Sequence, residues 1–232
     1  MAKKFAVLGV GNFGSHVATA LVQRGAEVLA IDRSPERLED VKDEVTHTVA
    51  LDTTDERALL SQDLGGFDAA VVSFGEDFET ALLTLGLLRQ AGVGRIIVRA
   101  TTRRHAQILN RLGVEDVVLP VPEAAERLAA RLVVEGLVDS LPLSDDFTMA
   151  EVDAPDPLVG RKTGELDLEG AYAVKLVTIR RVEEVRRLLG FGARTRQRIL
   201  GLVGADTVIE RGDRLVVFGE PRAIARLTGG GA

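Results

Sequence analysis

A glycine-rich turn near the start of the chain is the feature that most constrains its fold. Residues 5–8 are apolar, and the turn after them carries Gly9, Gly11 and Gly14 before a helical pattern begins. In this spacing the first glycine permits a tight turn, the second lets the backbone approach a phosphate, and the third lets the helix pack on the strand. The free N–H groups and the dipole at the helix start favour an anion. The segment, with Asn12 and Phe13 inside it, is therefore predicted to bind an adenine nucleotide.

Asp32 is the second part of this pattern. It ends the next strand segment, 27–31, at the place where an acid accepts hydrogen bonds from ribose hydroxyls. An acid there disfavours a 2′-phosphate, although Arg33 beside it leaves an opening for one. The alternative is a plain glycine turn followed by a helix-capping acid. The complete strand–turn–helix–strand context favours the nucleotide site.

Short aliphatic segments alternate with helical patterns over the first 140 residues. Strands this short and aliphatic are typical of a parallel sheet that is buried on both faces. Right-handed crossovers leave little choice of topology. The predicted fold class is α/β, a Rossmann-type doubly wound parallel sheet with a smaller C-terminal α+β domain. The strands are expected at 5–8, 27–31, 46–51, 69–73, 95–99 and 116–119, and helices at 13–24, 35–41, 78–91 and 102–112.

The predicted domain boundary lies between residues 141 and 142. A long helix, 123–137, is expected to leave the first domain, and the polar stretch 142–146 is interpreted as a linker. The second domain, 142–232, carries short strand patterns, a Gly-Asp turn, a closing helix and a glycine tail expected to be disordered. It has little apolar material, so we expect it to dimerise or to pack on the first domain. The strands are expected at 147–152, 172–179 and 214–218, and the helix at 221–227.

Further candidate ligand contacts come from residues that follow strands three, four and five. Ligands of doubly wound sheets lie outside the carboxyl ends of the strands, so these residues are expected at the same edge as the glycine turn. Residues after strand three are predicted to contact the adenosine, and those after strand four to form an apolar wall for the adenine. The arginine that ends strand five is predicted to face a phosphate. The alternative for the acids is helix capping. The residues are, in strand order, Asp52, Thr53 and Thr54, then Ser73, Phe74, Gly75 and Glu76, then Arg99.

Composition excludes several classes of function. The chain has no cysteine, which removes disulfides, thiolate zinc sites and cysteine nucleophiles. A net charge of −6 opposes general nucleic-acid binding, and no segment is apolar enough to be a signal or a membrane span. We therefore expect a soluble, cytoplasmic protein. Its three histidines and one tyrosine do not end strands at the ligand edge, so we expect no catalytic residue. A nucleotide pocket without catalytic residues indicates a sensor. The alternatives are an NAD-dependent oxidoreductase and a scaffold with a vestigial pocket.

Ordered motifs over nearly the whole chain resemble the RCK family, the TrkA/KtrA-type cytosolic subunits of potassium uptake. In the first domain they are residues 7–14, 27–32, 51–55, 68–75 and 96–100, and in the second residues 158–166 and 208–219. The resemblance implies a regulatory subunit that gates a membrane-embedded potassium transporter of TrkH/KtrB type from the inner face of the membrane. It also implies ATP/ADP or NAD(H) as ligand, and homo-oligomers in which dimers assemble into an octameric ring.

Two positions depart from the family's pattern. Asn12 stands where such proteins often carry an arginine that reaches the terminal phosphate of ATP. Val121 follows Pro120 where they often carry a metal-linked glutamate, and the nearest acid is Glu123. Both departures leave the choice between ATP/ADP and NAD(H), and any metal site, open.

The segment 182–205 is longer than the family's usual hairpin connection. It interleaves arginines with Leu188, Leu189, Ile199 and Leu200, which is compatible with a partner-docking element or with a cyclic di-AMP site in the second domain. The alternative is an exposed amphipathic insertion. The arginines are Arg186, Arg187, Arg194, Arg196 and Arg198.

Overall fold

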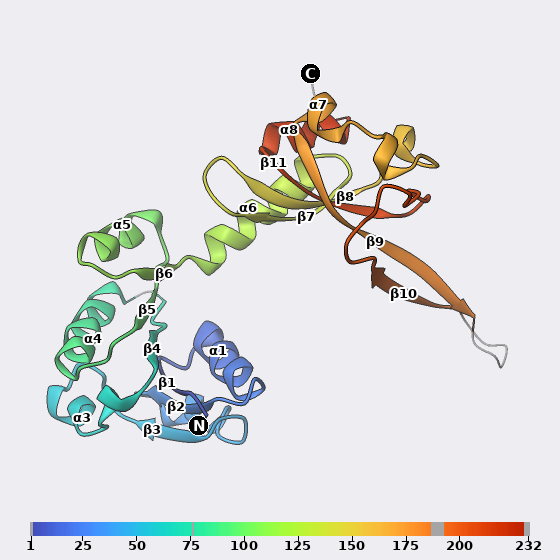
Figure 1. The fold of residues 1–232 in the computed structure, drawn as a ribbon. Helices are drawn as coiled ribbons and strands as arrows, with labels where there is room; N and C mark the ends of the chain where they lie inside the picture. Colours follow the sequence, from blue (N-terminus) through green and yellow to red (C-terminus); the bar gives the residue numbers. More distant parts are fainter. Residues whose placement is uncertain (1, 76, 187–192, 230–232) are drawn as a thin grey trace. The chain divides into compact units, whose positions relative to one another are not determined.

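The chain folds into two compact units, Met1–Glu123 and Ala124–Ala232 (Figure 1). The structure is a computed structural model that describes residues 2–75, 77–186 and 193–229. Side chains are described for these residues except 183–186 and 193–196. The two units divide earlier in the chain than the predicted boundary between residues 141 and 142.

Six parallel strands form the sheet of the first unit, in the order β3-β2-β1-β4-β5-β6. This order confirms the predicted doubly wound sheet of Rossmann type. β1 pairs with β2 on one side and with β4 on the other, so the strand order reverses at the carboxyl end of β1. The strands are β1 (Lys4–Leu8), β2 (Glu27–Asp32), β3 (His47–Ala50), β4 (Ala69–Val72), β5 (Ile96–Arg99) and β6 (Asp116–Val118).

Helices cover both faces of this sheet, as Figure 1 shows. α1 (Asn12–Val22) and α2 (Pro35–Glu39) pack on one face, while α3 (Glu56–Leu60), α4 (Phe78–Gln90) and α5 (Arg103–Arg111) pack on the other. Successive residues of β1 alternate between the two layers: Val7 belongs to the core under α1, and Ala6 and Leu8 belong to the core under α4. Burial on both sides explains the aliphatic strand sequences.

An antiparallel sheet forms the second unit, in the order β10-β9-β11-β8-β7. Two short helices, α7 (Leu168–Tyr172) and α8 (Pro221–Leu227), cover one face of it, and Ile179, Leu215 and Val217 are buried beneath them. Short 3-10 turns lie at Asp156–Leu158 and Thr163–Glu165, as another does at Leu64–Gly66 in the first unit. The strands are β7 (Leu137–Pro142), β8 (Thr148–Asp153), β9 (Val174–Arg186), β10 (Ala193–Ile199) and β11 (Arg214–Gly219).

The helix predicted over 123–137 is present but begins and ends earlier, and the prediction of a linker over 142–146 was wrong. Helix α6 spans Pro120–Val133, because proline is tolerated in a first helical turn. Gly136, with φ at 72°, then breaks the helix, and β7 begins at Leu137. Residues 143–146 turn the chain from β7 into β8, and the Leu143 N–H donates to the Phe147 carbonyl at 2.9 Å. The predicted linker is therefore a hairpin turn within the second unit.

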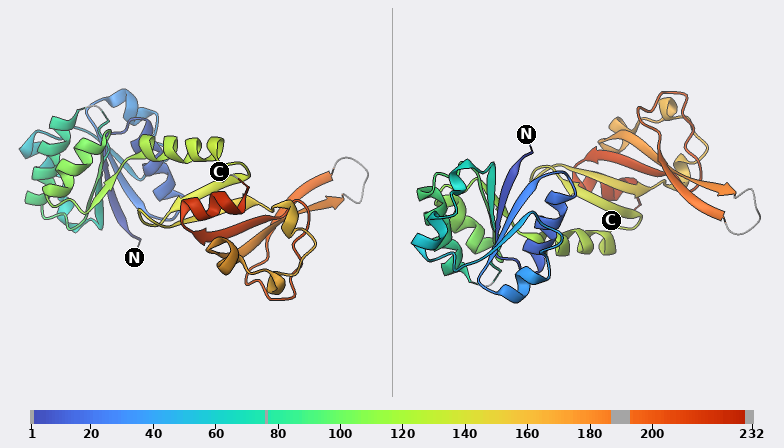
Figure 2. Two further views of the ribbon diagram at one scale, coloured as in Figure 1. Left: turned by 90° about the horizontal axis from the view of Figure 1, so that it is seen from above. Right: turned by 90° about the horizontal axis from the view of Figure 1, so that it is seen from below.

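The segment after residue 172 also differs from the prediction. Residues 168–172 are helical, so β9 starts at Val174 and continues to Arg186, well past the predicted end at 179. β10 returns antiparallel to it, and Figure 2 shows this hairpin extending beyond the rest of the sheet. The described part of the segment 182–205, for which a partner-docking element, a cyclic di-AMP site or an exposed amphipathic insertion was expected, contains this β-hairpin. Arg187 lies outside the described residues. The tail residues 230–232 also lie outside them.

Candidate functional site

The glycine turn joins β1 to α1 at the point where the strand order reverses. Gly9 has φ at 90°, and a Cβ there would lie 2.8 Å from the Phe74 ring. A Cβ on Gly14 would lie 2.0 Å from the Gly9 carbonyl oxygen. Gly11 has nothing within 4 Å of the corresponding position. Gly9 and Gly14 therefore permit close packing of the loop, whereas Gly11 borders open space where a ligand could approach the backbone.

The start of α1 is electrostatically suited to an anion. Within the described part of the chain, no side chain caps this helix, and its first turn carries no acid. Helices α2, α3, α4 and α5 are by contrast capped by the side chains of Ser34, Asp55, Asp77 and Thr102. Uncapped N–H groups at a helix start together with the helix dipole are the usual binding groups for phosphate.

Asp32 is buried, with 4% of its surface exposed, and braces the glycine turn. Its Oδ2 accepts a hydrogen bond from the Val10 N–H at 2.7 Å, and its Oδ1 accepts one from the Ser34 N–H at 2.9 Å. The Arg37 guanidinium lies 3.7 Å from Oδ2. A carboxylate has about four acceptor positions, so these contacts leave room for a ribose hydroxyl. Arg33 beside it is exposed.

Ser73 holds the other side of the turn. Its hydroxyl donates to the Gly9 carbonyl, and the Phe74 ring packs against the same glycine. Since Ser73 and Phe74 follow β4, the ends of β1 and β4 are locked together at the strand-order reversal. The turn is thus fixed from two sides, by Asp32 and by Ser73.

Arg99, at the end of β5, reaches toward this locked turn. Its guanidinium carbon lies 5.5 Å from the centroid of the Phe13 ring, and its Nη1 is 3.5 Å from the Ser73 carbonyl oxygen. A Cβ on Gly75 would lie 2.9 Å from Nη1. The buried Nε of Arg99 has no hydrogen-bond partner among the described residues. A cation is therefore held close to the glycine turn, with donor capacity left on its guanidinium.

The residues after β3 are divided between the site edge and the core. Asp52 is exposed, and its Oδ1 accepts hydrogen bonds from the Thr54 N–H at 2.9 Å and the Thr54 hydroxyl at 2.7 Å. These two bonds hold the pKa of Asp52 below its usual value, with a smaller contribution from the positive charge of Arg33. Thr53 is buried, and its hydroxyl accepts from Thr84 of α4 at 2.9 Å. Thr53 thus helps to hold α4 on the sheet, and its contact with a ligand stays a prediction. Glu76 lies outside the described residues.

A cavity of about 670 Å³ opens at Gly11 and Asn12 and runs along α1 to Asp40 and Glu44. Its volume is in the range of small-ligand sites. A second cavity, of about 250 Å³, lies at the amino ends of β5 and β6, beside Gly94 and Gly113. That is the opposite edge of the sheet, where ligands of this fold do not bind. The larger cavity is therefore the one associated with the glycine turn.

His105 lies at the ligand edge, although its sequence position predicts a surface helix. Its ring stacks on Phe78 at a centroid distance of 4.1 Å, and its Nδ1 is 3.2 Å from the Thr101 hydroxyl. Its position in the first turn of α5, directly after β5, was the signal that could have placed it there. His105 links the starts of α4 and α5.

Glu123 is the acidic residue nearest to Val121, where the chain departs from the family's pattern, and its side chain binds the backbone. The Glu123 Oε1 accepts from the Leu119 N–H at 3.2 Å, at the start of α6. Among the residues that the structure describes, no group of three or more histidine, aspartate or glutamate side chains could hold a metal ion. In the same residues, no helix is both long and apolar enough to cross a membrane.

Comparison with known proteins matches both units. Residues 5–120 match the TrkA-N domain and residues 147–228 match the TrkA-C domain. The Ktr system potassium uptake protein C of Bacillus subtilis (strain 168) is 32% identical over 226 residues, which are 97% of this chain and 96% of that protein. The Ktr system potassium uptake protein A of Vibrio alginolyticus is 25% identical over 96% of this chain and 95% of that protein.

Solved structures share the fold. The GsuK RCK domain superposes with a TM-score of 0.64 at 16% identity, over 100% of this chain and 49% of that chain. The GsuK channel bound to NAD gives the same TM-score and identity, over 100% of this chain and 40% of that chain. The chain thus spans about half the length of the RCK chain or less, and at this identity the likeness shows the fold.

Proposed function

The chain belongs to the family of TrkA-N/TrkA-C proteins, and we propose that it is the nucleotide-sensing regulatory subunit of a membrane potassium uptake system. Its relatives along the whole chain are Ktr system potassium uptake proteins. The observation that carries the sensing role is the glycine turn, which is fixed by Asp32 and Ser73 while Gly11 borders open space beside an uncapped helix.

The nucleotide phosphates bind at the start of α1, over Gly11, Asn12, Phe13 and Gly14. Asp32 accepts hydrogen bonds from the ribose hydroxyls, while Phe74 and Gly75 border the adenine. Arg99 faces a phosphate; this is supported by its Nε, which has no hydrogen-bond partner in the part of the chain that the structure describes, and by its position over Phe13. Asp52 and Thr54 lie at the rim, where the adenosine half enters. These roles follow from the general placement of dinucleotides and nucleotides on such sheets.

The ligand is an adenine nucleotide, either ATP/ADP or NAD(H). Asn12 brings no charge to the phosphate site, so Arg99, whose guanidinium lies over the Phe13 ring, supplies a cation for a polyphosphate or a pyrophosphate. A ring of such chains adopts two conformations that differ in affinity for the ligand, and that difference biases the transporter toward one state. No enzymatic step is proposed.

The partner is a membrane-embedded potassium transporter subunit, which places the protein at the cytoplasmic face of the membrane. Copies of the chain form dimers that assemble into an octameric ring. Exposed apolar residues of α6 support assembly: Val121, Leu128 and Leu132, spaced for one helix face, are 66%, 54% and 78% exposed. A cyclic di-AMP site in the second unit stays a prediction.

Potassium uptake tests the proposal directly. Cells without their own uptake systems would express the transporter subunit of the source organism with the parent chain or with Gly11→Ala. We expect potassium uptake to respond to adenine nucleotide levels with the parent and to lose that response with Gly11→Ala. Gly66→Ala is the matched control, because Gly66 also borders open space but lies far along the chain from the turn. Uptake that is identical with and without the parent chain would disprove the proposal.

A further inference from the structure

We propose that Arg37 of α2 binds a phosphate group of the nucleotide at the glycine turn. β2, which α2 follows, and β5, which ends in Arg99, lie on opposite sides of β1 in the sheet. A phosphate at the turn is therefore approached by two cations, Arg99 from one side and Arg37 from the other. The inference rests on the proposed function, since it needs a nucleotide at this turn.

The start of α2 fixes where the Arg37 side chain leaves the backbone. Ser34 caps the helix, and its hydroxyl accepts a hydrogen bond from the Arg37 N–H at 3.4 Å. Pro35 lies in the first helical turn, and the buried Leu38 belongs to the core under α1. Arg37 therefore stands in the first turn of a firmly packed helix, close to the end of β2.

The carboxylate of Asp32 directs the guanidinium of Arg37 toward the glycine turn. Its Oδ2 accepts a hydrogen bond from the Val10 N–H at 2.7 Å and lies 3.7 Å from Nη1 of Arg37. Because both contacts meet at one oxygen, the guanidinium lies beside the backbone of the turn. At 3.7 Å the ion pair is longer than a hydrogen bond, so it uses none of the five guanidinium donors. The Arg37 side chain is 61% exposed, so a ligand can reach these donors.

Arg37 shares a cavity with the predicted phosphate site. The cavity of about 670 Å³ is lined by Val10, Gly11 and Asn12 of the turn and by Arg37. Among the described residues, Arg37 is the only arginine or lysine that lines it. Asn12 is uncharged, so Arg37 adds a full positive charge to the uncapped start of α1, where phosphate binds. The planar fork of guanidinium donors matches the oxygens of a phosphate group.

The acids that line this cavity lie away from the turn. Glu44 accepts a hydrogen bond from the Thr19 hydroxyl at 2.9 Å. Thr19 follows Asn12 by seven residues, which is about 10 Å along α1. Asp40 caps the other end of α2 from the turn that holds Arg37. The cavity thus has its cation at the end where α1 begins and its acids further along, which favours an anion at the turn.

The phosphate can be part of the 5′ chain of the nucleotide or a 2′-phosphate on its ribose. Asp32 is the proposed ribose contact, so a guanidinium beside it is close to both positions. The negative charge of Asp32 opposes a 2′-phosphate, which favours the 5′ chain. Ligands that carry one or the other separate the two sources.

Isothermal titration of the full chain with adenosine, ADP, ATP, NADH and NADPH tests the proposal. In Arg37→Gln we expect the affinity for phosphorylated ligands to fall about tenfold, while the affinity for adenosine stays as in the parent. Arg37→Lys keeps the charge but not the fork of donors, so its loss should be smaller. A loss with ADP, ATP and NADH identifies the 5′ chain, and a loss with NADPH alone identifies the 2′-phosphate.

The matched control is Arg57→Gln, which removes the same charge from an exposed position of α3 and should bind every ligand as the parent does. Melting temperatures without ligand should agree for all four proteins, because the ion pair of an exposed arginine contributes little to stability. Equal binding by the parent and Arg37→Gln overturns the proposal and leaves the proposed function standing. An equal loss with adenosine also overturns it, since Arg37 would then act only through Asp32. A parent that binds none of these nucleotides contradicts the proposed function as well.

Discussion

At the scale of single residues, Gly9 and Gly14 allow the glycine turn to pack closely, whereas Gly11 borders open space where a ligand could approach. We expect Gly14→Ala to destabilise the protein by about 1–3 kcal/mol, because its Cβ would lie 2.0 Å from a backbone oxygen. Gly11→Ala should change stability by less than about 1 kcal/mol, since open space surrounds it. It should nevertheless weaken nucleotide binding at least roughly tenfold, as the methyl group would separate the phosphate from the backbone.

Thermal unfolding with and without nucleotide measures both effects on the same samples. Gly14→Ala should lower the melting temperature without nucleotide, whereas Gly11→Ala should mainly reduce the increase in melting temperature that nucleotide causes. A Gly11→Ala protein that binds nucleotide as tightly as the parent would show that the phosphate does not approach this glycine.

Asp32 is the residue proposed to accept hydrogen bonds from the ribose hydroxyls. Asp32→Ala removes a charged acceptor for ribose and the brace on the Val10 N–H. A hydrogen bond to a charged group contributes about 1.5–3 kcal/mol, so affinity for adenine nucleotide should fall about 10- to 100-fold. Calorimetric titration with ATP, ADP and NADH measures the loss, and Asp43→Ala, an exposed acid that does not line the cavity at the glycine turn, is the control. Unchanged binding of all three nucleotides by Asp32→Ala would refute the ribose role.

Sequence could place the main residues of the site but not the direction of each side chain. Gly9, Gly14 and Asp32 have spacings that are tied to one backbone geometry, so their structural roles could be derived. Thr53 follows a strand just as Asp52 does, yet its hydroxyl bonds to Thr84 in the core. Such a choice depends on where α4 packs, which is a long-range contact that local pattern does not encode.

At the scale of elements, the N-terminus of α4 should make the fold sensitive to acid. The Thr80 N–H, and after it the Thr80 hydroxyl, donate to Asp77 and hold its pKa below the usual value. The ionised carboxylate therefore stabilises the folded state above its ordinary pKa, and this stabilisation is lost as the pH falls through the lowered value. Asp77→Asn keeps an acceptor but cannot titrate, so its melting temperature should fall less steeply in acid than that of the parent.

A series of melting temperatures between neutral and strongly acidic pH checks this. Asp145→Asn, an exposed turn residue, is the control and should follow the parent curve. Parallel curves for the parent and Asp77→Asn would mean that this cap does not contribute to acid unfolding.

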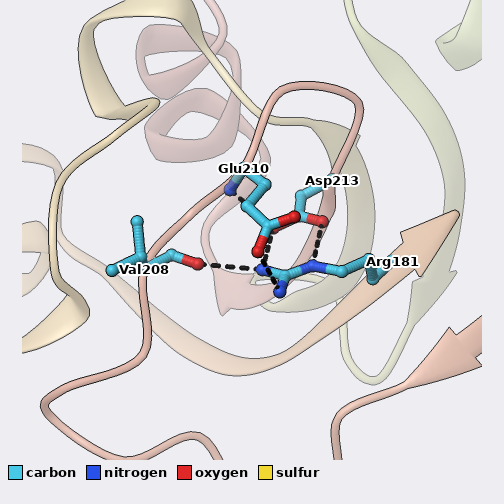
Figure 3. Close-up of polar contacts among 4 residues, drawn as sticks. All are labelled: Arg181, Val208, Glu210 and Asp213. Carbon is cyan, nitrogen blue, oxygen red and sulfur yellow. Dashed lines mark hydrogen bonds and ion pairs between the residues drawn. The ribbon is translucent and has the colours of Figure 1, made fainter. Parts of the chain in front are cut away.

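The ion pair between Arg181 of β9 and the buried Asp213 (Figure 3) should be among the sites most sensitive to mutation in the second unit. Arg181→Met leaves the Asp213 carboxylate buried without its main counter-charge, which typically costs about 3–5 kcal/mol. Arg181→Met/Asp213→Leu should cost less than the sum of the two single variants, because neither charge is then left alone. Lys162→Met, from an exposed ion pair with Asp206, should cost less than about 1 kcal/mol. Denaturant unfolding measures all four, and additive single costs would contradict the coupling.

Elements with strong local signals were predicted closely, while those at the domain junction were not. The six parallel strands and the closing helix have aliphatic runs or a proline start, and the structure has them within a few residues. Residues 137–141, Leu-Val-Asp-Ser-Leu, do not alternate apolar and polar side chains, and they follow a helical pattern that only Gly136 interrupts, so the sequence carries no clear signal for β7. The arginine-rich segment 182–205 predicts only an exposed amphipathic insertion, whereas the structure pairs β9 with β10 in this region, and such pairing depends on contacts that the local pattern does not specify.

At the scale of the whole molecule, nucleotide should stabilise the first unit by mass action. A ligand at 100 times its Kd adds about 2.7 kcal/mol if it binds the folded state alone. Differential scanning calorimetry should therefore show the transition of the first unit moving to higher temperature with nucleotide. Equal shifts of every transition would instead indicate that the ligand couples the two units.

The central claim is that this member of the TrkA-N/TrkA-C family senses an adenine nucleotide at the turn from Gly9 to Gly14. Isothermal titration of the full chain with ATP, ADP and NADH, beside Gly11→Ala and the Gly66→Ala control, tests it most directly. The account predicts that at least one of the three binds the parent and the control with equal affinity and binds Gly11→Ala at least roughly tenfold more weakly. A parent chain that binds none of them, or a Gly11→Ala variant that binds as the parent does, would contradict it.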